Sequence, residues 1–74
     1  MSKLYSGKQV IKTLQRAGFS IVSQKGSHVK LRGIRDNEPQ TAIVPNHKEV
    51  AFGTFRSILS QAKMTIEEFE SYVK

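Results

Sequence analysis

Residues 24–33 read QKGSHVKLRG, a pattern that predicts two strands joined by a tight turn. Gly26 and Ser27 form a dipeptide typical of a tight turn, with strand-forming residues before and after it. Beyond the turn, the apolar residues Val29 and Leu31 alternate with polar ones, as in a strand with one buried face. The polar face of that strand would carry His28, Lys30 and Arg32. The stretch therefore predicts an antiparallel hairpin with one apolar face and one basic face.

A helix should precede this hairpin. Ser6 and Gln9 have the spacing of a capping box, in which side chains and backbone satisfy each other at the first helical turn. Apolar residues then recur at helical spacing: Val10, Ile11, Leu14 and Ala17. Gly18 ends the helix, because glycine adopts the left-handed conformation there without steric cost. The first strand of the hairpin is then expected over 19–25, alternating around Phe19, Ile21 and Ser23.

Three elements are predicted after the hairpin. We expect a polar loop over 33–39 and a short third strand over 41–44, ended by Pro45, which cannot donate to a ladder. Helical periodicity returns after Gly53, in the apolar stripe Phe55, Ile58, Leu59 and Ala62. Thr65 begins a second capping box, which opens a terminal helix.

The element order α-β-β-β-α-α predicts one α+β domain over 1–74, a three-stranded antiparallel sheet with helices packed on one face. The other face, with His28, Lys30 and Arg32, would then be open to solvent. The chain has no cysteine, which suits a reducing cytoplasm. No apolar run approaches the length of a membrane span, so we expect a cytoplasmic protein with no membrane partner.

Positive charge is concentrated in the first half of the chain. Residues 1–35 contain eight Lys and Arg residues and no acid, whereas residues 36–74 contain four basic and six acidic residues. Three of the basic residues recur every fourth position on the first helix: Lys8, Lys12 and Arg16. A basic half on so small a domain points to a polyanion such as nucleic acid. A basic surface that serves only solubility is the alternative.

His28 could act as a catalytic group within this basic surface. Neighbouring cations disfavour a proton on its imidazole, so we expect a neutral ring near pH 7 that can act as a general base. RNA supplies a nucleophile, the ribose 2′-hydroxyl, and Lys or Arg could stabilise the transition state without a metal. A lone strand histidine is more often a surface residue, so binding without catalysis stays open. His47 is a second candidate, although histidine is common in loops such as the one that follows Pro45.

Longer motifs point to a known family. These are SGKQVIKTLQRAGF over 6–19, QKGSH over 24–28, VPNHKEVAFGTFRSILSQA over 44–62, and the TIEEF that follows shortly after. With them the chain resembles the HicA toxins, small bacterial mRNA interferases of type II toxin–antitoxin modules. The resemblance implies a fold similar to double-stranded-RNA-binding domains and an endoribonuclease that cuts mRNA. It also implies that His28 is catalytic and that a HicB-type antitoxin covers the active face.

The resulting hypothesis makes His28 the catalytic residue of an RNase toxin. The residues predicted to bind RNA are Lys8, Lys12, Lys25, Gly26, Ser27, Lys30 and Arg32. No metal site and no small-molecule cofactor are expected, because the two histidines are far apart in sequence and no cysteine is present. The first alternative is a non-catalytic double-stranded-RNA-binding module, which grips a duplex by its shape and phosphates. The second is a DNA-binding regulator, for which the chain lacks a clear recognition helix.

Overall fold

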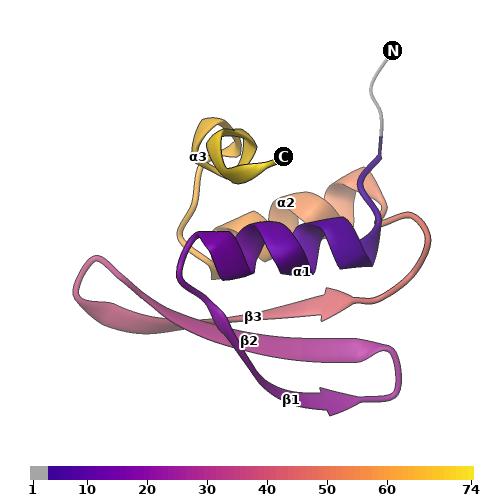
Figure 1. Ribbon diagram of the computed structural model, residues 1–74, viewed down its shortest axis with the longest axis horizontal. Coiled ribbons are helices and arrows are strands. Elements are labelled where there is room, and N and C mark those ends of the chain that lie inside the picture. The colour runs from indigo at the N-terminus through magenta and orange to yellow at the C-terminus, as the bar shows by residue number, and fades with distance from the viewer. Residues whose placement is uncertain (1–3) are drawn as a thin grey trace.

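The computed structural model describes residues 4–74 of the chain. The strands form one layer, with the helices above it (Figure 1). The elements follow in the predicted order: α1 Gly7–Arg16, β1 Ser20–Lys25, β2 His28–Arg35, β3 Glu38–Pro45, α2 Phe52–Gln61 and α3 Ile66–Tyr72. The predicted α+β class is therefore confirmed. Within the described residues, no helix has the length and apolar character needed to cross a membrane.

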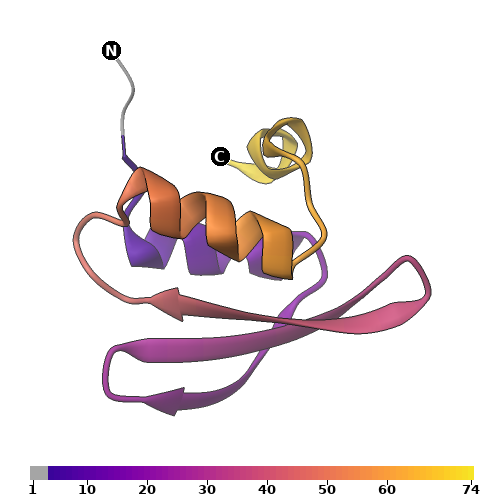
Figure 2. The ribbon, with the colours of Figure 1, turned by 180° about the vertical axis from the view of Figure 1, so that it is seen from behind.

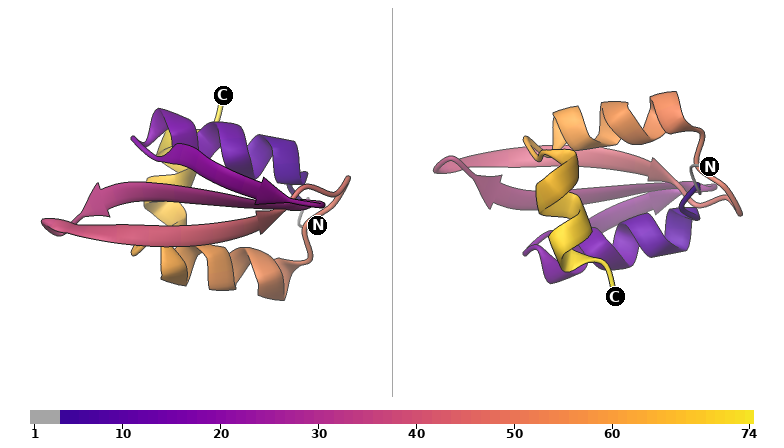
Figure 3. Two further views of the ribbon diagram at one scale, coloured as in Figure 1. Left: turned by 90° about the horizontal axis from the view of Figure 1, so that it is seen from below. Right: turned by 90° about the horizontal axis from the view of Figure 1, so that it is seen from above.

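The strands form one antiparallel sheet in the order β1-β2-β3. The helices α1 and α2 lie against the same side of the sheet, and α3 lies across them on the side away from the strands (Figure 1). Seen from behind, α2 runs along the β3 side of the sheet (Figure 2). Seen from below, the strands stand in front of the helices (Figure 3, left). In the part of the chain that the structure describes, no element covers this face, which we call the open face.

The core lies between the sheet and the helices. Its fully buried side chains include Leu31 of β2, Leu14 of α1, Ile58 of α2 and Phe69 of α3. The sheet and all the helices named here therefore contribute to the same core. Burying a side chain of this size stabilises the fold by about 1.5–3 kcal/mol. The apolar stripes predicted for the helices are the faces that pack there.

Both predicted capping boxes are formed. At the start of α1, the Ser6 hydroxyl accepts from the Gln9 N–H at 3.0 Å, and the Gln9 side chain accepts from the Ser6 N–H at 2.9 Å. Thr65 and Glu68 make the same reciprocal pair at the start of α3, with both distances 3.0 Å. By contrast, α2 begins at Phe52, one residue before Gly53, and no side chain caps it.

The prediction of a polar loop over 33–39 was wrong. β2 continues to Arg35 and β3 begins at Glu38, so a two-residue turn of Asp36 and Asn37 joins them. Both turn residues have positive φ, 55° and 63°, as a type I′ hairpin turn requires, and Asp and Asn tolerate that conformation. The misleading residues were Gly33 and Pro39, which usually interrupt strands.

Each of these two residues fits its strand for a structural reason. A Cβ atom at Gly33 would lie 2.8 Å from the ring of Phe19, so glycine makes room for that buried side chain. Pro39 is tolerated because β3 is an edge strand, where one side of the backbone needs no ladder partner.

The alternation predicted for the first strand is interrupted. Phe19 is buried, but β1 begins only at Ser20, and all of its residues are exposed. The pairing with β2 shifts register between Ile21 and Ser23, which leaves Val22 without a Cα partner. Because β1 is an edge strand with this irregularity, Ile21 and Val22 stay about half exposed, at 47% and 52%.

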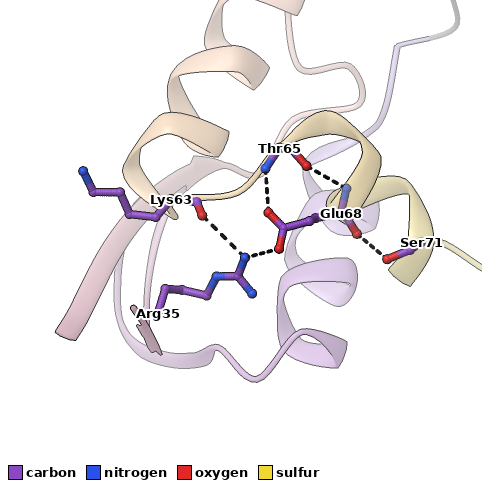
Figure 4. Close-up of polar contacts among 5 residues, drawn as sticks. All are labelled: Arg35, Lys63, Thr65, Glu68 and Ser71. Carbon is purple, nitrogen blue, oxygen red and sulfur yellow. Dashed lines mark hydrogen bonds and ion pairs between the residues drawn. The ribbon is translucent and has the colours of Figure 1, made fainter. Parts of the chain in front are cut away.

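The helix α3 is attached to the sheet and to α1 by polar contacts. The Arg35 guanidinium at the end of β2 forms an ion pair with Glu68 (Figure 4). At the last residue of the helix, Arg16 of α1 donates to the Tyr72 carbonyl at 2.9 Å. The backbone N–H of Thr65, followed by the Arg35 side chain, holds the pKa of the Glu68 carboxyl below its ordinary value of 4.5.

This contact makes a prediction about acid stability. A carboxylate whose folded-state pKa is lowered contributes stability above its unfolded pKa, and the contribution is lost as pH falls through the folded value. Glu68→Gln keeps an oxygen that accepts from Thr65 but removes the charge facing Arg35. We expect the variant to be less stable than wild type near neutral pH. The difference in stability between the two proteins should become smaller in acid. Thermal unfolding between about pH 7 and about pH 3 measures both effects.

The control for this experiment is Glu67→Gln, an exposed carboxylate in the same first turn of α3. It should follow the wild type more closely than Glu68→Gln does. If wild type and Glu68→Gln lose stability in parallel as the pH falls, the Arg35 contact contributes nothing to acid sensitivity.

Candidate functional site

The open face carries the polar row predicted for β2. Val29 and Leu31 are almost fully buried, and the residues that alternate with them are exposed. Since successive strand side chains point to opposite faces, the exposed ones share the open face. Along β2 they are His28, Lys30, Arg32 and Ile34.

The neighbouring strands add side chains beside this row. In the register of the sheet, Lys25 of β1 pairs with His28 and Ser23 with Lys30, while Ile43 of β3 pairs with Lys30 from the other side. These five residues line a shallow hollow of about 420 Å³, the His28 hollow. Two of the predicted RNA-binding residues, Lys25 and Lys30, therefore lie together with the predicted catalytic histidine.

Arg32 lies one step further along the same face. It pairs with Ser20 on one side and with Thr41 on the other, and its Nε donates to the Thr41 hydroxyl at 3.3 Å. This bond holds the stem of the arginine against β3. Arg32 thus extends the positive row beyond the His28 hollow without lining it.

The turn that precedes His28 has the geometry its sequence predicts. Gly26 has φ +59°, as the first central residue of a type II′ turn requires, and glycine adopts this value without strain. The Gln24 side chain donates to the Gly26 carbonyl at 3.1 Å. Ser27 is half-buried and makes contacts outside the hairpin. Its carbonyl accepts from the N–H of Asn46 at 2.7 Å.

The two predicted lysines of α1 do not join the His28 hollow. Lys8 is exposed in the first turn of the helix. Lys12 is exposed and shares a small surface depression with Arg16 and Lys74, near the C-terminal end of the chain. Because α1 belongs to the helical layer, the basic ridge that the sequence shows borders a different part of the surface from the His28 row.

His47 lies closer to the predicted site than sequence reasoning suggested. Its Nε2 atom is 3.1 Å from the hydroxyl of Ser27, the residue directly before His28. The sequence offers His47 as a second candidate but favours an ordinary loop histidine, and it does not predict Ser23 or Ile43 as site residues. The alternation of Ile43 with the buried residues Ala42 and Val44 would have placed it on the open face. Nothing local in the sequence reports the contact with Ser27.

A second hollow, of about 320 Å³, lies on the helical side of the molecule. Aromatic and aliphatic residues line most of it, and Glu70 is its one charged residue. It contains neither a histidine nor a cation, so it lacks the positive groups that would bind a phosphate. Within residues 4–74, no three His, Cys, Asp or Glu side chains come close enough together to hold a metal ion. Of these two hollows, only the His28 hollow therefore combines a histidine with cations.

Comparison with known families gives one match. The family model for the HicA toxin of bacterial toxin–antitoxin systems matches residues 7–64. These residues run from the first residue of α1 to just before the cap of α3, and they include every residue of the His28 hollow and His47. Among curated proteins, none matches the chain.

Proposed function

Because the chain belongs to the HicA toxin family, we propose that it is an endoribonuclease that cleaves mRNA without a metal ion, with His28 as the general acid–base. Its toxin role follows from the family. RNA as the substrate, the chemistry and a HicB-type antitoxin partner are parts of the proposal. The observation that carries it is the position of His28, which is exposed in a hollow that Lys25 and Lys30 also line.

The proposed reaction uses the nucleophile that RNA itself provides. The His28 imidazole accepts the proton of a ribose 2′-hydroxyl, and the 2′-oxygen attacks the neighbouring phosphorus. The bond from phosphorus to the 5′-oxygen breaks, and that oxygen is protonated as it leaves. The products are a 2′,3′-cyclic phosphate on one fragment and a 5′-hydroxyl on the other. Lys25 and Lys30, which line the hollow together with His28, would stabilise the negative charge that builds up on the phosphoryl oxygens.

The row along β2 supports binding of an extended phosphate backbone. Alternate residues of a strand are roughly 7 Å apart, so Lys30 and Arg32 offer successive positive groups along one line from His28. The backbone of Gly26 and Ser27 lies at the end of that line and, without bulky side chains, would let a phosphate approach closely. Phosphate contacts of this kind bind RNA with little dependence on sequence.

The same surface suits an inhibitory partner. A HicB-type antitoxin that presents acidic side chains to Lys25, Lys30 and Arg32 would compete with RNA for the row and cover His28. Toxin inhibition would then need no change in the fold of the toxin.

The test of this function is the chemistry of the cut ends. Purified protein incubated with a defined RNA in the presence of EDTA should produce fragments ending in 2′,3′-cyclic phosphate, because the ribose hydroxyl is the nucleophile. Mass spectrometry of the fragments identifies the ends. A matched RNA with a single 2′-deoxy sugar at the cut position should stay intact there.

Two results would contradict the proposal. Cleavage at the deoxy position would exclude the ribose hydroxyl as the nucleophile. RNA that is bound but never cut would favour the non-catalytic RNA-binding module instead.

A further inference from the structure

Three segments that are distant in sequence meet at one end of the molecule. The turn between β1 and β2, the end of β3 with the residues after it, and the start of α1 all lie at the right-hand end in Figure 1. We call residues 45–47, which follow β3 directly, the Pro45–His47 loop. The predicted catalytic residue, His28, is the first residue of β2 after the turn and pairs with Pro45 across the sheet.

The Pro45–His47 loop attaches to the turn through Ser27. The N–H of Asn46 donates to the Ser27 carbonyl at 2.7 Å, and the Nε2 of His47 lies 3.1 Å from the Ser27 hydroxyl. Both the backbone and the side chain of Ser27 are therefore held. Since Ser27 is bonded to His28, these contacts restrict the backbone from which the His28 side chain projects.

The loop is itself held against α1. The N–H of Gly7, the first residue of the helix, donates to the His47 carbonyl at 2.8 Å. Gly7 is buried against the loop, and a Cβ atom there would lie 2.3 Å from the Pro45 carbonyl oxygen and 2.6 Å from the Asn46 Cα. Those distances allow only a glycine at this position. The N-terminus of α1 thus sets where the Pro45–His47 loop lies.

From these contacts we propose that His47 is a positioning residue for His28, acting through Ser27. The inference rests on the proposed function, because it assigns His47 a part in the chemistry of His28. The ring of His47 connects the helical layer, through Gly7 and the loop, to the turn that opens β2. Its role is to keep the His28 imidazole aimed at the substrate, and it transfers no proton itself.

The hydrogen bond between His47 and Ser27 does not depend on the protonation state of His47. A serine hydroxyl both donates and accepts, so it can bond to the Nε2 of His47 whether that nitrogen carries a proton or not. The support would therefore persist when the charge of His47 changes. A glutamine side chain places an amide group near the position of Nε2 and can make the same bond to Ser27.

Glutamine can make the bond to Ser27 but cannot transfer a proton as histidine does. Variants at position 47 therefore distinguish a positioning residue from a proton donor. His47→Ala should lower kcat for RNA cleavage by about 10–100-fold, because small misplacements of a catalytic group cost about that much. KM should change little, since the phosphate-binding lysines remain. His47→Gln should recover most of the lost kcat. Lys48→Ala, a change at an exposed residue next to the Pro45–His47 loop, is the matched control and should behave like wild type.

A double-mutant cycle and NMR complete the test. If His47 acts through Ser27, the combined Ser27→Ala and His47→Ala variant should be no slower than the slower single variant. The His28 ring signals of free protein should shift in His47→Ala and not in Lys48→Ala, a readout that needs no RNA.

Three outcomes would overturn the inference. One is a His47→Gln variant as slow as His47→Ala, which would make His47 a proton-transfer group. The others are additive losses in the cycle and His28 signals that do not respond to His47→Ala. Failure of the proposed function would look different: wild type would leave RNA uncut, whatever residue stands at position 47.

Discussion

Replacing His28 by alanine should slow RNA cleavage by about 10²–10⁴-fold, the usual contribution of a positioned general acid or base. The variant should keep its fold, because the His28 side chain is exposed on the open face and fills no part of the core. Single-turnover cleavage of a defined RNA measures the effect, and a thermal unfolding curve verifies the fold. In cells, expression of the wild type should arrest growth, whereas His28→Ala should be tolerated.

Binding provides the matched control for that experiment. His28→Ala should bind RNA almost as well as wild type, since Lys25, Lys30 and Arg32 remain in place. Reversing the charges of Lys30 and Arg32 together should do the opposite and weaken binding to all RNA sequences alike, with a reduced dependence on salt. If His28→Ala cleaves as fast as wild type, the histidine is not catalytic and its hollow serves only to bind.

The second large effect concerns stability, and it lies outside the matched family segment. Phe69→Ala should destabilise the protein by about 3–5 kcal/mol, which is typical for removing a buried aromatic side chain. Phe69 is fully buried, and its ring centroid lies 4.9 Å from that of Phe55 and 5.2 Å from that of Tyr5, both in edge-to-face contact. A domain this small has a net stability of about 3–5 kcal/mol, so the variant should be largely unfolded.

Urea denaturation followed by circular dichroism measures this loss. Tyr72→Ala, an aromatic truncation at a partly exposed position of the same helix, should cost much less. The comparison tests whether α3, which follows the matched residues 7–64, belongs to the core. A cost below about 1 kcal/mol for Phe69→Ala would mean that α3 merely rests on the surface.

Much of the fold was predictable because it depends on neighbours in the sequence. The capping boxes at Ser6 and Thr65 involve residues three positions apart, and both are present as predicted. The alternation around Val29 and Leu31 reports which side of a strand is buried, since strand side chains alternate by geometry alone. The basic row that begins at His28 follows from the same rule. The boundary that failed, over 33–39, failed because Gly33 and Pro39 were judged without their neighbours in space.

The order of elements, the open face and the grouping of His28 with Lys30 could therefore be predicted from local patterns, because each depends on periods of two to four residues. The meeting of Gly7, Ser27 and His47 depends on tertiary packing, since each lies about 20 residues from the next along the chain. Their contacts exist because α1 and the sheet pack against a common core, which brings the start of a helix, a hairpin turn and a loop to one end. No periodicity within any one segment encodes that meeting, because its energy comes from packing between segments.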